Sequence, residues 1–469
     1  MVDYTEPGCI TLRKRPTKEQ FGQQLEQFAK ELREEMITGK WAPGSFLPPE
    51  KSLEIRFGLS NHSIRLGLEQ LVQEGWIEKI PSVGNRVVAD RPPVHLTVAC
   101  NHVMLRNLKL AGLIEQFRRL YPWITVEVRS WSGSVPGVDL TERVLTDDLA
   151  LMDNVQFQQL LERKLTHVFE PFAGSYDLYP QFSAHFSAED RLLLLPIVLS
   201  PLVLCYNKAH FRESGLAEPN GSWTWDDLIR HAELLYDGRG RYGFAFHIQS
   251  MYRWPLFLMQ SGERFEWDGA QLRDIRRSRL LDGLKRCKDI LHNRKAVPLY
   301  LSENNDDIDR MFMEGKLSMA LNTYMGLNGW TERQIEYDIS PVPYMDSLRT
   351  LLITLGVGVN GSSAHKAEAK LFADYLASPE AQSYMYQHTL SVPGLATLPM
   401  KQTERSVYSP DRYMLFRETM GSFRTHAELN ISSAAFVSLA NLLKPYWANM
   451  IDEDELCDRL SEALRTEAY

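Results

Sequence analysis

Cysteine, long apolar runs and an excess of positive charge are all scarce in this sequence. Its 469 residues include 5 cysteines, which are widely spaced and form no Cys-x-x-Cys pair, so neither a zinc site nor a disulfide framework is indicated. An apolar run of about eighteen residues, the minimum for a membrane span, does not occur. The N-terminal residues are acidic and lack the apolar core of an export signal. We therefore expect a cytoplasmic protein without membrane segments.

The net charge of −8 is distributed unevenly. Basic and acidic residues balance within residues 1–92, so the whole acidic excess lies in the remainder of the chain. If the first part binds nucleic acid, the binding must depend on a local basic patch and on two copies acting together, because that part is not polycationic.

Residues 47–88 carry the pattern of a winged helix-turn-helix. Pro48 and Pro49 suit the start of one helix, and Gly58 suits the left-handed residue that ends it. Ser60 is placed to cap a second helix, which carries an apolar stripe at helical spacing: Ile64, Leu68 and Leu71. A hairpin with glycine at its tip follows. The outward side of the second helix is then free to enter a DNA groove.

This ordered pattern resembles the DNA-binding domain of GntR-type bacterial transcription regulators. The matches are Gly39, Pro43-Gly44, Leu47-Pro48-x-Glu50, Leu59-Ser60-x-x-Ser63-Ile64-Arg65, Leu71-x-x-Glu74-Gly75 and Gly84. The resemblance implies DNA contacts from Lys51, Ser60, Asn61, His62, Ser63, Arg65, Gly84 and Arg86. The family usually has arginine where this chain has Lys51 and Asn61, so a bidentate guanidinium contact is lost at both positions.

Alternating strand and helix patterns begin after a proline-containing connector. We expect a DNA-binding domain over 1–90, a stiff linker over 91–94 with Pro92 and Pro93, and a sensor domain over 95–469. Apolar segments at 95–100, 124–129 and 148–153 predict strands, and 108–121 predicts a helix between the first two, so the sensor begins as an α/β fold.

Several motifs after residue 192 resemble, in order, the sugar-binding family of extracellular solute-binding proteins. They include Tyr206-Asn207-Lys208, Trp225-Asp226-Asp227, Phe312-x-x-Gly315-Lys316-x-x-Met319 and Ala377-Ser-Pro-Glu-Ala-Gln382. The resemblance implies two α/β lobes, a periplasmic-binding-protein type II-like arrangement, with a ligand held in the cleft where strand ends face each other. Aromatic faces and amides suit a saccharide, so the predicted ligand contacts are Asn101, His102, Trp131, Asp153, Asn154, Ser200, Tyr252, Trp254, Asn322 and Tyr324.

Two features of the sequence bear on the alternatives. Sugar binders commonly place a carboxylate near the crossing strand, and Ser200 there weakens the carbohydrate interpretation, so a non-sugar solute stays open. An aminotransferase-like second domain would need a lysine for pyridoxal phosphate in a suitable motif, and none is found. No catalytic pair, metal site or cofactor motif is recognised.

The sequence thus predicts a cytoplasmic, ligand-responsive transcription regulator and not an enzyme. We expect a homodimer on double-stranded operator DNA, because one winged helix reads few base pairs. We further expect ligand-induced lobe closure to reach the DNA-binding heads through the connector at Pro92 and Pro93.

Overall fold

The computed structural model describes residues 18–88, 92–131, 144–173, 176–298, 302, 304–330, 335–401 and 405–464. They form two compact units: residues up to His95 with Glu115–Thr125, and Leu96–Ile114 with Val126 onward. Among the described residues, every helix is too short or too polar to cross a bilayer.

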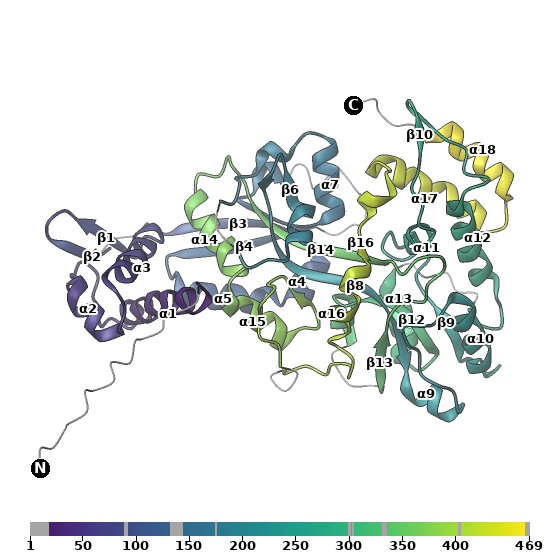
Figure 1. The fold of residues 1–469 in the computed structure, drawn as a ribbon, viewed down its shortest axis with the longest axis horizontal. Coiled ribbons are helices and arrows are strands. Elements are labelled where there is room, and N and C mark those ends of the chain that lie inside the picture. Colours follow the sequence, from purple (N-terminus) through teal and green to yellow (C-terminus); the bar gives the residue numbers. More distant parts are fainter. Residues whose placement is uncertain are drawn as a thin grey trace, which may run out of the picture. The chain divides into compact units, whose positions relative to one another are not determined.

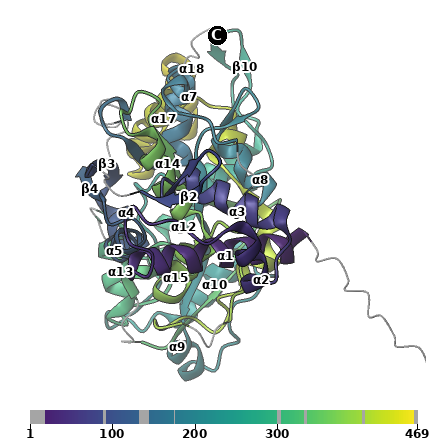
Figure 2. The ribbon, with the colours of Figure 1, turned by 90° about the vertical axis from the view of Figure 1, so that its left-hand side faces the viewer.

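The first unit contains three helices and a hairpin: α1 (Lys18–Ile37), α2 (Glu50–Phe57), α3 (Asn61–Gln73), β1 (Ile77–Ile80) and β2 (Gly84–Val87). Figure 2 shows the three helices, labelled α1, α2 and α3. Gly58 ends α2 with a φ of 65°, and the Ser60 side chain accepts from the Ser63 backbone N–H at the start of α3. Both capping predictions are therefore confirmed.

A close approach of α1 to α3 builds the core of this unit. Phe28 and Leu32 of α1 and Ile64 and Leu68 of α3 are buried. A Cβ at Gly67 would lie 2.4 Å from the Phe28 ring, so the packing of the two helices depends on a glycine at this point. The apolar stripe predicted for the second helix thus faces the core, which leaves the other side of α3 exposed.

The wing is an antiparallel hairpin to which a third segment is hydrogen-bonded. Ile77 pairs with Val87, and Ile80 pairs with Gly84. Residues before α2 add to it, because the Leu47 N–H donates to Asn85 O and the Val87 N–H donates to Ser45 O. The sequence pattern predicted the hairpin but not this third segment.

An aromatic cluster packs the base of the wing onto residues 115–125 within the first unit. Trp76 is 5% exposed, and its ring lies edge-on to Trp123 at a centroid distance of 4.8 Å and tilted against Tyr121 at 6.1 Å. The Val94 N–H donates to Trp123 O at 2.8 Å. We name Trp76, Tyr121 and Trp123 the aromatic joint.

The second unit is an α/β fold of many elements (Figure 1). In its first part they are β3 (Val94–Asn101), α4 (His102–Leu108), α5 (Leu110–Leu120), β4 (Ile124–Trp131), β5 (Leu149–Asp153), α7 (Asn154–Glu162), η1 (Thr166–Val168), α8 (Pro180–Ser183), η2 (Ala184–Phe186), β6 (Ser187–Ala188), β7 (Arg191–Leu192) and β8 (Leu195–Asn207). By the two-unit division, β3, α5 and β4 contribute residues to both units.

The next elements are α9 (Lys208–Glu213), α10 (Trp225–Leu235), β9 (Tyr242–Ala245), α11 (Pro255–Gln260), β10 (Trp267–Asp268), β11 (Gln271–Leu272), α12 (Arg279–His292), α13 (Asn305–Met313), β12 (Leu317–Thr323), η3 (Gly326–Trp330) and β13 (Tyr337–Ser340). The last are β14 (Thr350–Val359), α14 (Lys366–Leu376), α15 (Pro379–His388), β15 (Val392–Pro393), α16 (Leu415–Thr419), η5 (Met420–Ser422), β16 (Phe423–Arg424), η6 (His426–Leu429), α17 (Ser433–Trp447) and α18 (Glu453–Ala463).

Strand β8 joins two lobes, because its two ends belong to different parts of one sheet. The strand order is β4-β3-β5-β14-β8-β12-β9. Residues Leu195–Pro201 of β8 pair with β14, whereas Leu202–Asn207 pair with β12 and β13. All thirteen residues of β8 are buried. Burial on both faces explains why this strand is a nearly continuous apolar run in the sequence.

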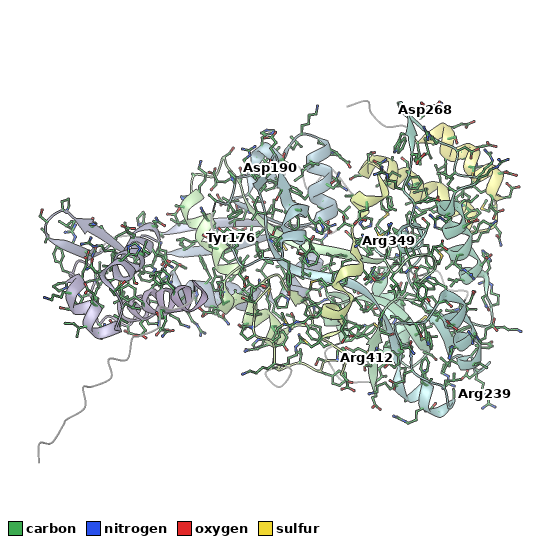
Figure 3. The ribbon with its side chains drawn as sticks, viewed as in Figure 1. Tyr176, Asp190, Arg239, Asp268, Arg349 and Arg412 are labelled. Atoms are coloured by element: carbon green, nitrogen blue, oxygen red, sulfur yellow. The ribbon has the colours of Figure 1, made fainter. Side chains whose placement is uncertain are left out.

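Each lobe has its own helices and core. Lobe one contains β3, β5, α4, α7, α14 and α15; there the Tyr176 hydroxyl, labelled in Figure 3, donates to Asp374 of α14 at 2.7 Å. Lobe two contains β9, β12 and α10–α13 with α17 and α18, around a core that includes Trp225, Trp254 and Phe257. The predicted two-lobed fold is confirmed.

Candidate functional sites

The exposed face of α3 and the start of α2 carry most of the residues predicted to contact DNA. Lys51, Asn61, His62 and Arg65 are exposed. Gly84 and Arg86 lie on β2, where the Arg86 guanidinium is about half exposed and pairs with Glu78 at 2.7 Å. Two helices and the wing thus present polar side chains that can reach phosphates or base edges.

Acidic side chains hold two of these residues in the DNA-free protein. Arg65 Nε donates to Glu50 Oε2 at 2.8 Å, and Asn61 Nδ2 donates to the same oxygen at 3.3 Å. The Arg65 guanidinium lowers the pKa of Glu50, so this carboxylate is ionised and competes with a phosphate. To bind a DNA phosphate, Arg65 must therefore release the Glu50 carboxylate.

Ser60 and Ser63 serve the helix start. Ser63 is 5% exposed, and its hydroxyl lies 2.8 Å from the Ser60 hydroxyl. Ser60 is exposed but uses its side chain to accept from the Ser63 N–H. Ser63, although implied as a DNA contact by the resemblance, is buried, because the residue lies on the same side of α3 as the core residue Gly67.

A cavity of about 960 Å³ lies between the two lobes. Its described lining is rich in amides, which come from Asn101, Asn107, Asn154, Gln156, Gln158, Gln159, Gln249, Asn304, Asn305 and Asn322. Its charged lining residues are Arg106, Arg253, Asp153, Asp306 and Asp309. Such a lining can exchange many hydrogen bonds with a polar ligand.

Helix α7 of lobe one touches lobe two at both of its ends. Asp153 caps α7 by accepting from the Val155 and Gln156 N–H groups, and its Oδ2 accepts from the Tyr252 hydroxyl at 2.7 Å. At the other end, the Glu162 carboxylate accepts from the Ser433 N–H at 2.9 Å. These bonds join the two walls of the cavity, as expected of a closed cleft.

Five of the ten predicted ligand residues line this cavity: Asn101, Asp153, Asn154, Tyr252 and Asn322. Several of these side chains also have structural partners. Asn101 Oδ1 caps α4 by accepting from the Val103 N–H, and Asn154 Oδ1 accepts from the Thr354 N–H. Their remaining amide N–H groups are the parts that a ligand can use.

Four of the other predicted residues do not line the cavity. His102 begins α4 on its exposed side. Ser200 is fully buried in β8, where its hydroxyl accepts from the Met325 N–H. Trp254 stacks on Phe436 in the core of lobe two, and the Tyr324 hydroxyl donates to Tyr413 O. Trp131 ends β4, and its side chain lies outside the described part.

Most residues that line the cavity were not singled out in the sequence, among them three with ionisable side chains. Arg253 is 4% exposed and lies between two predicted residues, Tyr252 and Trp254. Asp309 lies one turn before Phe312, the first residue of a recognised motif. His426 follows β16, and its Nε2–H donates to Met251 O. A charged residue within an aromatic run was the one signal that could have identified Arg253.

Burial fixes the protonation state of two side chains that line the cavity, His426 and Tyr252. Burial lowers the pKa of His426 to about 4, so its ring is neutral at physiological pH. Burial also raises the pKa of Tyr252, which keeps its hydroxyl protonated as a donor to Asp153. The ring of Tyr252 meets His426 edge-on at 5.8 Å, so lobe two presents an uncharged aromatic wall here.

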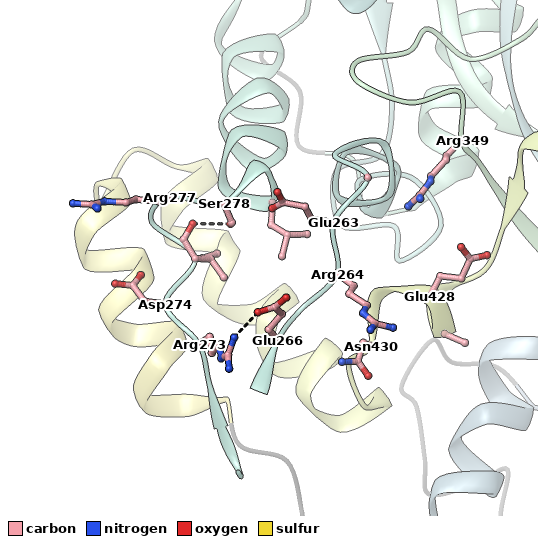
Figure 4. A pocket seen from close by; sticks show the side chains of 14 residues that line it. Glu263, Arg264, Glu266, Arg273, Asp274, Arg277, Ser278, Arg349, Glu428 and Asn430 are labelled. Carbon is pink, nitrogen blue, oxygen red and sulfur yellow. Dashed lines mark hydrogen bonds and ion pairs between the residues drawn. The ribbon is translucent and has the colours of Figure 1, made fainter. Parts of the chain in front are cut away.

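A second cavity, of about 710 Å³, lies in lobe two beside the start of α12 (Figure 4). Its acidic residues are each paired with an arginine: Glu263 with Arg279, Glu266 with Arg273, Asp274 with Arg276, and Glu428 with Arg424. These pairs are solvent-accessible, so water screens their charges and each carboxylate is already compensated by an arginine. The interlobe cavity is therefore the stronger candidate for ligand binding.

Family comparisons agree with both halves of this architecture. The family described as bacterial extracellular solute-binding protein matches residues 108–383, and the gntR family of bacterial regulatory proteins matches residues 24–87. The chain belongs to the solute-binding family and carries a GntR-type DNA-binding domain at its N-terminal side. The second domain has a solute-binding fold, so the aminotransferase alternative is wrong, and neither matched family is a family of enzymes.

Two curated relatives each match one part of the chain. The mannosyl-D-glycerate transport/metabolism system repressor MngR of Escherichia coli is 37% identical over 65 residues, which are 14% of this chain and 27% of the relative. The probable amino-acid ABC transporter periplasmic-binding protein y4oP of Sinorhizobium fredii is 25% identical over 234 residues, 46% of this chain and 52% of the relative. The chain thus spans about a quarter and about half of their lengths.

Solved structures match the second part of the chain in fold. The substrate-binding protein Lmo0181 of Listeria monocytogenes in complex with cycloalternan has a TM-score of 0.69 at 16% identity, covering 79% of this chain and 98% of that one. Maltose-bound MalE3 of T. maritima has a TM-score of 0.69 at 15% identity, covering 79% and 99%. At this identity the likeness shows the fold.

Proposed function

We propose that this protein is a cytoplasmic transcription regulator that senses a small solute, a sugar or an oligosaccharide, by closing its two lobes. The observation that carries the proposal is the presence in one chain of a DNA-binding domain with an exposed recognition helix and of a solute-binding fold with an interlobe cavity of about 960 Å³. We further propose a domain organisation of 1–90, a linker over 91–94, and 95–469, and a homodimer on a palindromic operator. Ala89, Asp90 and Arg91 at this boundary lie outside the described residues.

The polar groups of the cavity support a saccharide over an amino acid as the proposed ligand. An amino acid needs a cation for its α-carboxylate. Arg106 lies 3.8 Å from Asp306, and Arg253 already donates to Leu321 O, Tyr252 O and Asn322 Oδ1. Amide groups and carboxylates suit the hydroxyl groups of a sugar instead. The name of the Sinorhizobium relative keeps amino acids as the second candidate class.

We propose that DNA is contacted by Lys51, Asn61, His62, Arg65, Gly84 and Arg86, with Ser60 and Ser63 shaping the start of the recognition helix. The proposed ligand contacts are Asn101, Asp153, Asn154 and Tyr252, with Asn322 behind them. Lobe closure is supported by the two bonds that α7 makes to lobe two, from Tyr252 to Asp153 and from Ser433 to Glu162.

A thermal-shift screen tests the ligand class. We expect maltose, maltotriose or another neutral saccharide to raise the unfolding temperature of the purified protein, while the common amino acids do not. A ligand at 100 times its Kd adds about 2.7 kcal/mol of apparent stability. A shift with amino acids and none with saccharides would reject the sugar part of the proposal and leave the regulator intact.

A further inference from the structure

Asp309 is an acidic side chain of the interlobe cavity that neither the sequence motifs nor the family comparison assigns a role. It lies on α13 of lobe two and lines the cavity. One of its oxygens, Oδ1, accepts from Asn322 Nδ2 at 3.1 Å. Asn322 is the last but one residue of β12, so the Asp309 carboxyl is hydrogen-bonded to the sheet.

Asn322 is fixed by bonds on both sides of its amide. Its Oδ1 accepts from Arg253 Nη2 at 3.0 Å and from the Thr323 N–H at 2.9 Å. The Nδ2 group must therefore be the donor to Asp309. Arg253 is itself anchored, because its Nε donates to Leu321 O at 3.2 Å. A buried relay of Arg253 and Asn322 thus orients Asp309.

The charged and titratable groups around Asp309 come from several elements. Asp306, Asp307 and Arg310 share α13, Arg253 precedes α11, Cys205 lies on β8, His247 follows β9, and Arg106 on α4 pairs with Asp306. Burial, with a smaller contribution from Asp306, raises the pKa of Asp309 to about 7, against the opposing effects of Arg253 and of hydrogen bonds from Trp330 and Asn322. The carboxyl is therefore about half protonated near pH 7.

We propose that Asp309 is a specificity-determining residue of the cleft, whose carboxylate accepts hydrogen bonds from hydroxyl groups of an uncharged polyhydroxylated ligand. Both arginines of the described charged lining have partners within the protein, Asp306 for Arg106 and Asn322 for Arg253, so a ligand that brings a negative charge meets no unengaged arginine there. This inference rests on the proposed sensing of a saccharide. It adds that Asp309, in its ionised form, selects this ligand.

The pH dependence of binding follows from this role. A hydroxyl donor interacts more strongly with a carboxylate than with a carboxylic acid, so the ligand lowers the pKa of Asp309 when it binds. By linkage, ligand affinity then increases as pH rises through 7. If only the ionised form binds, the increase between pH 6 and pH 8 is about tenfold, because the ionised fraction rises from about a tenth to about nine-tenths.

The experiment measures binding of maltose and maltotriose to the full-length protein by calorimetry at pH 6, 7 and 8. We expect the affinity of the wild type to rise about tenfold across this range. Asp309→Asn should bind at least about tenfold more weakly at pH 8 and show no such rise. Asp306→Asn should keep the rise but move its midpoint to lower pH, because a like charge is removed. Asp268→Asn, on the exposed turn of β10, is the matched control and should behave as the wild type.

The possible outcomes separate this inference from the function on which it rests. Saccharide binding that is the same at pH 6 and pH 8, or that is unchanged in Asp309→Asn, would overturn the role of Asp309 and leave the sensor proposal standing. If neither saccharide binds the wild type at any pH, the sugar-sensing proposal fails, and this inference fails with it. Equal unfolding temperatures of Asp309→Asn and the wild type at pH 6 show that the variant is folded.

Discussion

Replacing Arg65 by alanine is expected to weaken operator binding by about tenfold for each DNA-binding domain and by about a hundredfold for a dimer. Arg65 is 60% exposed on α3 and is positioned by Glu50, the glutamate of the Leu-Pro-x-Glu motif. In the complex its guanidinium would leave this carboxylate for a phosphate or a base edge. Loss of the side chain removes that contact, whereas the buried face of α3 is unchanged.

Gel-shift titration of an operator fragment at several salt concentrations measures this effect. The salt dependence should also become shallower, by about one ion per lost phosphate contact. Arg191→Ala is a matched control, because Arg191 is similarly exposed and pairs with Glu189 in the other unit. Equal operator affinity of Arg65→Ala and the wild type would exclude this residue from the DNA interface.

Replacing Trp123 by alanine is expected to uncouple ligand binding from DNA binding while leaving each intact. Trp123 ends the turn between α5 and β4, and it packs at 4.8 Å against Trp76 at the base of the wing. Both α5 and β4 also contribute residues to the second unit. A shift of these elements on lobe closure would thus reach the wing through the aromatic joint. This route through packed side chains would act in addition to the connector at Pro92 and Pro93.

Coupling is measured as the ratio of operator affinities with and without saturating ligand. For the wild type this factor is expected to lie between about 5 and 150, as in other allosteric proteins, and for Trp123→Ala it should approach one. Trp267→Ala removes a half-buried tryptophan on β10, far along the chain from the joint, and should keep the coupling. A Trp123→Ala protein with full coupling would exclude the joint as the route.

Sequence patterns predicted those elements whose structure depends on residues close together in the chain. Gly58, Ser60 and the stripe at Ile64, Leu68 and Leu71 place α2 and α3, because capping and helical periodicity depend on neighbouring residues. The helix predicted over 108–121 corresponds to α5 (Leu110–Leu120), but the shorter helix α4 before it was missed. Helix α4 begins at His102 and ends at Lys109, a non-glycine residue with a φ of 51° that no local pattern indicates.

The cavity lining was predicted less well, because it depends on contacts between distant residues. Asn322 was correctly placed at the cleft, but its bonds to Arg253 and Asp309 join residues that lie 69 and 13 positions away. Trp254 and Tyr324 are aromatic residues at predicted loop positions, yet both are buried in the cores. Residue type alone does not separate an aromatic side chain that binds a sugar from one that packs.

The central claim is that one protein binds solute and operator and that each alters the affinity for the other. The most direct test is calorimetric titration of the saccharide found by the thermal-shift screen into the protein, once alone and once saturated with operator DNA. The account predicts that ligand affinity changes by the same factor by which ligand changes operator affinity, as linkage requires. Equal ligand affinity with and without operator would contradict it.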